Sequence, residues 1–265
     1  MLRHLLPGLL MLTAASCAPA GQRSEVAAAD AAGEWEGVAF RRIAPGVWLH
    51  SAFREVPGFG RTVSNGLVVE NGETSVLVDT AWDDAQTRTI LQWAREHLHR
   101  PVAAAVVTHA HSDKMGGMAA LHSAGVKTFA NRLTNADAPA RDLIPAQIGL
   151  DFDTNGWLTP ASAEAAADLG PLRVFYPGAG HTRDNIVVGL AQAKIIFGGC
   201  LIRPPGSTDM GNTGDGDLSH WDIAAQRAGD TFPGANVVVP SHGPPAGREL
   251  IALTARLARE ARAEK

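Results

Sequence analysis

Two histidines and an aspartate stand at alternate positions in residues 106–117, VVTHAHSDKMGG. They are His109, His111 and Asp113, and they come directly after an apolar run that predicts a buried strand. In an extended segment alternate side chains share one face, so we expect the two imidazoles and the carboxylate to project to the same side. Such groups are costly to bury without partners, and a divalent cation such as zinc would satisfy all three.

Three more residues of ligand type follow predicted strands further along the chain. His181 comes after a strand and a Pro/Gly turn in YPGAGHTRDN, Cys200 ends a strand in IIFGGCLIR, and His242 ends one in VVVPSHGPP. Open α/β folds place their ligands at strand ends. Six candidates are too many for one tetrahedral zinc, but they fit two zincs with three protein ligands each and a shared water or hydroxide.

Composition excludes some classes of partner. The chain has 265 residues, of which 45% are hydrophobic and 19% are charged, as in a globular protein of one large domain or two small ones. A net charge of -4 without a dense Lys/Arg run argues against nucleic acid as a partner. The two cysteines, Cys17 and Cys200, lie in segments of different character, so we expect no intrachain disulfide.

The first 34 residues have the features of an export signal and a tether. Residues 1–17 combine a short basic start, an apolar stretch too short to span a bilayer and small residues before Cys17, which predicts a signal peptide. TAASC also resembles a bacterial lipoprotein cleavage box, although Ala14 stands where a larger aliphatic residue is usual. Two alternatives stay open: a periplasmic protein anchored to the outer membrane through lipidated Cys17, and simple soluble export. Residues 18–34 predict a flexible tether.

The pattern over residues 35–265 predicts a single α/β domain. Two β-hairpins are expected, over 38–53 with a Pro45-Gly46 turn and over 64–82 with an Asn71-Gly72 turn. The remaining expected helices are 83–100, 116–125, 133–142, 219–230 and one from about 247, and the remaining strands are 101–109, 126–130, 172–178, 185–191, 194–199 and 236–240. Strands with interspersed helices indicate an α/β sandwich.

Taken together, H-x-H-x-D-x-x-G-G, G-H-T, G-G-C and S-H resemble the motifs of the metallo-β-lactamases, in the subclass with one three-histidine site and one Asp-Cys-His site. The resemblance extends over essentially the whole chain after the leader, including VPGFG and GNTGD. It implies a four-layer αβ/βα sandwich that binds two Zn²⁺ per chain. Carried over residue by residue, the first zinc has the ligands His109, His111 and His181, and the second has Asp113, Cys200 and His242.

The resemblance also implies an activity, the hydrolysis of the β-lactam amide of penicillins, cephalosporins and carbapenems, which confers antibiotic resistance. A metal-held hydroxide attacks the lactam carbonyl, the amide of Asn212 helps to stabilise the oxyanion, and Asp113 orients the nucleophile. Arg203 is expected to pair with the substrate carboxylate. The resembled enzyme has a lysine at this position, and arginine keeps the charge while adding a planar fork of donors.

Two apolar elements are expected to form walls of the site. The segment 54–62, REVPGFGRT, predicts a mobile flap that carries Val56 and Phe59 over the substrate, with Phe59 folded back on the core as the alternative. Trp82 is expected either to line the opposite side or to pack in the core. Asp79, Ser112 and Lys114 are candidates for orienting the zinc ligands.

Two alternative functions come from other classes. Thioesterases, lactonases and phosphodiesterases of the same superfamily typically continue H-x-H-x-D-H and bridge both metals with an aspartate, whereas Lys114 and Cys200 occupy those places here. A non-enzymatic zinc-binding lipoprotein would be expected to have lost a ligand, and none of the six candidates is lost. The sequence therefore favours an enzyme that acts on small β-lactam molecules and needs no obligate protein partner.

Overall fold

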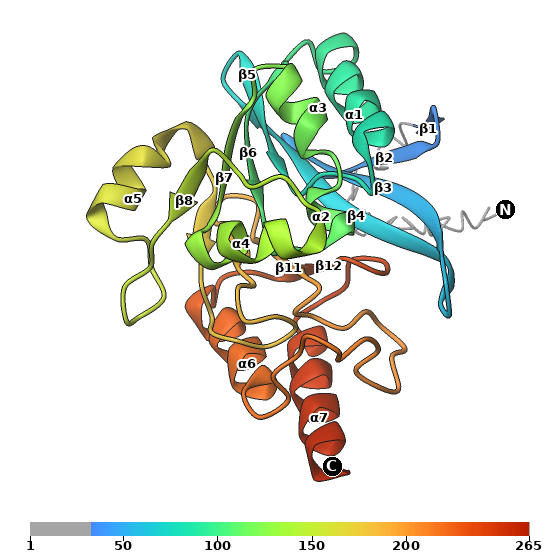
Figure 1. The fold of residues 1–265 in the computed structure, drawn as a ribbon, viewed down its shortest axis with the longest axis vertical. Coiled ribbons are helices and arrows are strands. Elements are labelled where there is room, and N and C mark those ends of the chain that lie inside the picture. Colours follow the sequence, from blue (N-terminus) through green and yellow to red (C-terminus); the bar gives the residue numbers. More distant parts are fainter. Residues whose placement is uncertain (1–32, 265) are drawn as a thin grey trace, which may run out of the picture.

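The computed structural model describes residues 33–264 (Figure 1). The predicted signal peptide with Cys17, and the predicted tether up to residue 32, lie outside the described residues. Glu34, expected to end the tether, instead begins the first strand, β1 (Glu34–Trp35). Within residues 33–264 no helix is long and apolar enough to cross a membrane.

The first sheet has eight strands in chain order. Its antiparallel half is β1, β2 (Val38–Ala44), β3 (Val47–Val56), β4 (Gly60–Asn71) and β5 (Thr74–Val78), and its parallel half continues through β6 (Val102–Val107), β7 (Lys127–Asn131) and β8 (Ile148–Leu150). Gly46 and Gly72 have φ values of 69° and 59° at the two predicted hairpin turns. Glycine adopts this left-handed conformation without a steric penalty, which explains why the hairpins turn there.

The second sheet has four strands in the order β12-β11-β10-β9. They are β9 (Arg173–Phe175), β10 (Val187–Leu190), β11 (Ile195–Gly199) and β12 (Val237–Pro240). The helices are α1 (Asp84–Glu96), α2 (Ser112–Met115), α3 (Met118–Ser123), α4 (Arg132–Asp137), α5 (Pro160–Ala165), α6 (Trp221–Thr231) and α7 (Glu249–Ala263), with 3₁₀ turns at Ala138–Arg141 and Ala167–Leu169. Strand β8 and helix α5 were not predicted.

Three apolar cores separate four layers. Side chains alternate along a strand, so Leu77 of β5 packs toward α1 and α3, while Val76 and Val78 pack between the two sheets. A third core joins the second sheet to α6 and α7, with Trp221 fully buried in it. Figure 1 shows α1 and α3 on the outside of one sheet and α6 and α7 on the opposite side of the molecule. The four-layer α/β sandwich is therefore confirmed.

The prediction of an extended segment through Asp113 is wrong. Strand β6 ends at Val107, and the chain turns into α2 with His111 as its N-cap residue. The amides of Lys114 and Met115 both donate to the carbonyl of His111, at 3.0 and 2.9 Å. A tight turn, and not strand alternation, thus brings the chemical side chains together.

The predicted flap also has a different form. Strand β3 continues to Val56 and β4 begins at Gly60, so residues 54–62 are the end of a long antiparallel hairpin and only 57–59 form its tip. The amide of Phe59 donates to the carbonyl of Val56 at 2.9 Å and closes this turn. The apolar tip is therefore carried by paired strands.

Candidate active site

A cavity of about 620 Å³ opens where the carboxyl ends of β6, β11 and β12 meet, with the β3–β4 hairpin at its rim. It is lined by all but one of the residues that the sequence singled out as ligands or substrate contacts. The exception is His109, which is 1% exposed and lies beneath His111. Segments far apart in the sequence thus contribute to one site.

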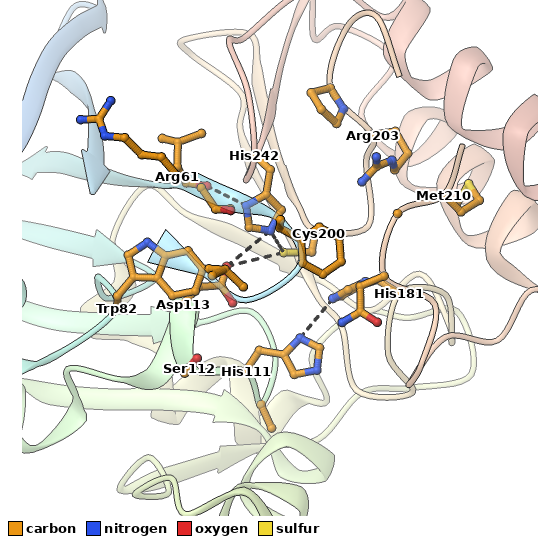
Figure 2. Close-up of a pocket in the computed structure, with 18 of the residues that line it drawn as sticks. Arg61, Trp82, His111, Ser112, Asp113, His181, Cys200, Arg203, Met210 and His242 are labelled. Carbon is orange, nitrogen blue, oxygen red and sulfur yellow. Dashed lines mark hydrogen bonds and ion pairs between the residues drawn. The ribbon is translucent and has the colours of Figure 1, made fainter. Parts of the chain in front are cut away.

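The three histidines assigned to the first zinc converge on one point, and Figure 2 shows two of them, His111 and His181, facing each other. His111 Nδ1 lies 3.1 Å from His109 Nε2 and 3.2 Å from His181 Nε2. All three donor atoms lie within 4.8 Å of one another. Nitrogens at about 2.0 Å from a tetrahedral zinc would be roughly 3.3 Å apart, so this spacing fits the ion.

The second group is equally compact. Cys200 Sγ lies 3.2 Å from His242 Nε2 and 3.8 Å from Asp113 Oδ2, and the last two atoms are 3.6 Å apart. His109, Asp113 and Cys200 also have donor atoms within 4.8 Å of one another. We keep His109 with the other imidazoles because its nitrogen is 3.1 Å from His111. The overlap shows that the two groups are neighbours.

Hydrogen bonds on the far side of two rings fix which nitrogen faces the cavity. His242 Nδ1 donates to the carbonyl of Val63 at 2.7 Å. In the neutral ring Nε2 is then unprotonated, and its lone pair is available to a metal. Thr108 Oγ1 donates to Asp79 Oδ2 at 2.9 Å, so it accepts from His109 Nδ1 at 3.1 Å. Both rings therefore present Nε2 to the site, as zinc ligation requires.

Two of the three residues expected to orient the ligands, Lys114 and Asp79, contact a candidate ligand or one of its partners. The third, Ser112, makes no such contact among the described residues, and Ser64 contacts Asp113 instead. Lys114 is fully buried, with Nζ 3.2 Å from Asp113 Oδ2 and 3.7 Å from Asp79 Oδ2. Its ammonium donates to Ser64 Oγ at 2.7 Å, and Ser64 Oγ donates to the carbonyl of Asp113 at 2.9 Å. Ser112 only lines the cavity.

Burial and neighbouring charges shift the pKa values of three of the candidate ligands. Burial alone would raise the pKa of Asp113, but the Lys114 ammonium and the neighbouring His242 hold that pKa well below its usual range. Burial, with His111 beside it, lowers the pKa of His181 to about 3, so its imidazole is neutral at pH 7. Burial and Asp113 raise the pKa of the Cys200 thiol, and a bound metal would drive its deprotonation.

The two predicted polar substrate contacts lie in the loop that follows β11. Arg203 Nε donates to the carbonyl of Asp209 at 3.0 Å, and burial lowers the pKa of the guanidinium from its ordinary high value. Asn212 accepts from the amide of Gly214 at 3.0 Å through Oδ1, which leaves its NH₂ group to donate. In Figure 2, Arg203 lies on the side of the cavity away from Trp82.

Apolar side chains form the remaining walls. Phe59 is 62% exposed at the hairpin tip, so it is not folded back on the core. Trp82 combines both predicted roles, because it lines the cavity while its indole is 8% exposed and donates to the carbonyl of Ala52 at 3.3 Å. Leu143 and Met210 also line the cavity and were not predicted, since they lie in loops without a motif.

Comparison with known proteins adds independent information. The family model described as "Metallo-beta-lactamase superfamily" matches residues 59–242. A protein named metallo-beta-lactamase type 2 from Bacteroides fragilis is 33% identical over 222 residues, covering 84% of this chain and 86% of that protein. One with the same name from Bacillus cereus is 32% identical over 219 residues, covering 81% and 80%.

Solved structures give the same result. A metallo-β-lactamase from Erythrobacter litoralis is 48% identical with a TM-score of 0.82, covering 86% of this chain and 98% of that one. The metallo-β-lactamase FIM-1 from Pseudomonas aeruginosa, in its mono-zinc form, is 50% identical with a TM-score of 0.79, covering 84% and 96%. Fold and sequence therefore agree over nearly the whole described chain.

Proposed function

Because the chain belongs to the metallo-β-lactamase superfamily, we propose that it is a zinc-dependent β-lactamase that hydrolyses penicillins, cephalosporins and carbapenems and so confers antibiotic resistance. The observation that carries this proposal is the pair of adjacent donor groups at one cavity, His109–His111–His181 and Asp113–Cys200–His242, of which all but His109 line it. A β-lactam is a small amide, and the cavity of about 620 Å³ is of the size that holds small molecules.

The donor set fits two Zn²⁺ per chain. Three neutral imidazoles leave the charge of one ion unreduced, whereas a carboxylate and a thiolate lower the net charge at the other. Zinc held there supplies a Lewis acid that acidifies water near neutral pH and stabilises negative charge on the reacting oxygen and nitrogen.

The chain's own residues bind and orient the reactants. Asp113 has its carboxylate 3.6 Å from His242 and can accept a hydrogen bond from the attacking water. The free NH₂ group of Asn212 donates to the lactam oxygen as negative charge develops on it. Arg203 pairs with the carboxylate that bicyclic β-lactams carry, and Val56, Phe59 and Trp82 contact the apolar substituents.

One feature in particular separates this proposal from the other hydrolases of the superfamily. The position where those enzymes have an extra histidine is Lys114, whose ammonium is fully buried and ion-paired with Asp113. A lysine held in this way is protonated, with burial opposed by Asp113 and Cys200 so that its pKa rises to about 12. It offers no lone pair to a metal.

A substrate panel tests the activity directly. Purified chain with zinc is assayed against a penicillin, a cephalosporin, a carbapenem, a thioester, a lactone and a phosphodiester. We expect kcat/KM for the three β-lactams to exceed the others by several orders of magnitude. Faster turnover of the thioester, the lactone or the phosphodiester would assign the other hydrolase class, and turnover of none would favour a binding protein.

We propose that the mature protein is periplasmic and anchored to the outer membrane through lipidated Cys17. TAASC before a small-residue segment supports this proposal. Mass spectrometry of the mature amino terminus would show diacylglycerol on Cys17, and Cys17→Ala would move the protein from the membrane fraction to the soluble periplasm. An unmodified amino terminus in the soluble fraction would contradict the anchor.

A further inference from the structure

His111, a candidate zinc ligand, contacts the carboxylate of Asp215, which is in turn paired with Arg141. His111 Nε2 lies 2.9 Å from Asp215 Oδ2, and the same oxygen accepts from Arg141 Nη1 at 2.8 Å. Arg141 ends the 3₁₀ turn Ala138–Arg141, and Asp215 lies in the loop between β11 and α6. The pair therefore joins the two halves of the chain beside the three-histidine group.

The direction of these bonds determines which nitrogen of His111 can bind a metal. Its Nδ1 faces the Nε2 atoms of His109 and His181. The opposite nitrogen carries the proton and donates it to the carboxylate of Asp215. A carboxylate in this place fixes the tautomer and the ring orientation, and it makes the imidazole a stronger ligand.

Asp215 needs support in order to act in this way. Its side chain is 40% exposed and stands on a loop, where a carboxylate alone would turn toward water. Arg141 is 33% exposed and holds the carboxylate against the His111 ring. The same carboxylate oxygen thus accepts one hydrogen bond from Arg141 at 2.8 Å and one from His111 at 2.9 Å, and these two bonds fix its place.

We propose that Arg141, acting through Asp215, is a positioning residue that orients His111 and strengthens zinc binding at the three-histidine group. The inference rests on the proposed zinc binding. Cys200 and His242 make no described contact with this pair, so the other group should keep its affinity. The sign of the effect is diagnostic, because removing a positive charge near a cation would by Coulomb's law alone tighten zinc binding.

Zinc affinity measured by competition with a chromophoric chelator tests the proposal. Asp215→Ala should weaken the three-histidine site by about 10- to 100-fold, and Arg141→Ala by up to about 10-fold. In the Asp215→Ala background, Arg141→Ala should have no further effect, because its partner is gone. Arg132→Ala is the matched control, since it removes an exposed pair with Asp151, at 2.5 Å, away from the cavity.

Cobalt substitution gives a readout independent of activity. In Arg141→Ala the ligand-field bands of cobalt at the histidine group should weaken or shift, while the thiolate charge-transfer band from Cys200 stays. Arg141→Lys should restore part of the affinity, because it keeps a cation beside Asp215.

The possible results separate this inference from the proposed function. Arg141→Ala with unchanged or tighter zinc binding would overturn the inference, as would a loss that persists fully in the Asp215→Ala background. A wild-type chain that binds no zinc would contradict the proposed function itself.

Discussion

At the scale of single residues, candidate ligands are held by side chains that are distant in sequence: Ser64 contacts Lys114 beside Asp113, and Asp215 contacts His111. Histidine and cysteine directly after predicted strands stand out, so the sequence singled out the six candidate donors, and the structure brings their side chains together. Ser64, within β4, and Asp215, in the loop before α6, were missed because nothing in their own sequence neighbourhoods marks them as partners of a ligand. Their partners, Lys114 and His111, lie 50 and 104 residues away in the chain.

Cys200 gives the first prediction at this scale. Serine is a poorer zinc ligand than thiolate, so Cys200→Ser should lose zinc from the second group and lower kcat by about 100-fold or more. Metal analysis and steady-state kinetics measure both effects. His99→Gln, an exposed histidine outside the cavity, is the control. Full zinc content with kinetics like those of the wild type would contradict the role of Cys200.

Arg203 gives the second prediction about a single residue. Removing a charge-assisted contact to the substrate carboxylate should lower kcat/KM of Arg203→Ala by roughly 10- to 100-fold, mainly through KM. Arg203→Lys should retain most of the efficiency because it keeps the charge. Arg256→Ala, on the exposed face of α7, serves as the control. An unchanged KM would show that Arg203 only holds the loop at Asp209.

At the scale of elements, close packing positions the short helix α2, which carries Asp113, and the turn that joins it to α3. A Cβ on Gly116 would lie 2.1 Å from the carbonyl oxygen of Trp82, and one on Gly117 would lie 1.9 Å from Thr87 Oγ1. The turn between α2 and α3 can therefore lie this close to Trp82 and to α1 only with glycine at both positions. The sequence predicted the helix over 116–125 that contains the glycine pair, but not α2 before it, because periodicity is weak over four residues.

A prediction about stability follows for this element. Gly117→Ala should lower the free energy of unfolding by about 1–3 kcal/mol, because Thr87 and α1 must shift to admit the methyl group. Denaturant unfolding of the metal-free protein measures the change. Gly149→Ala, whose Cβ would meet its nearest neighbour at an ordinary 3.5 Å, is the control. Equal stability of the two variants would contradict the packing argument.

For the molecule as a whole, strand and helix periodicity predicted the layers but not how the halves join. Asn65 in β4 donates to the carbonyls of Pro240 at 2.9 Å and Gly243 at 2.7 Å, next to His242. Such bonds link positions about 175 residues apart. No local pattern reports them, so the seam between the sheets appeared only in the structure. Strand β8 and helix α5 were missed for another reason, since periodicity is weak over three and six residues.

Acid should destabilise the metal-free molecule through His50, which is fully buried between the strands. Burial, with the Lys114 charge, lowers its pKa to about 3, whereas the unfolded chain takes up a proton near pH 6.5. The unfolded state therefore binds more protons as pH falls below 6.5, and stability should fall by about 2 kcal/mol by pH 5 from this group. Unfolding of His50→Gln, with His99→Gln as control, should show a shallower loss; an identical pH dependence would contradict the assignment.

Zinc dependence of β-lactam hydrolysis tests the central claim most directly. The mature chain is purified, its zinc is counted, and hydrolysis of a carbapenem is followed before chelation, after chelation and after zinc is restored. We predict two zinc ions per chain, loss of activity with the metal, and recovery with two equivalents of zinc. No hydrolysis by the fully loaded protein would contradict the function, and activity indifferent to chelation would contradict the metal-dependent mechanism.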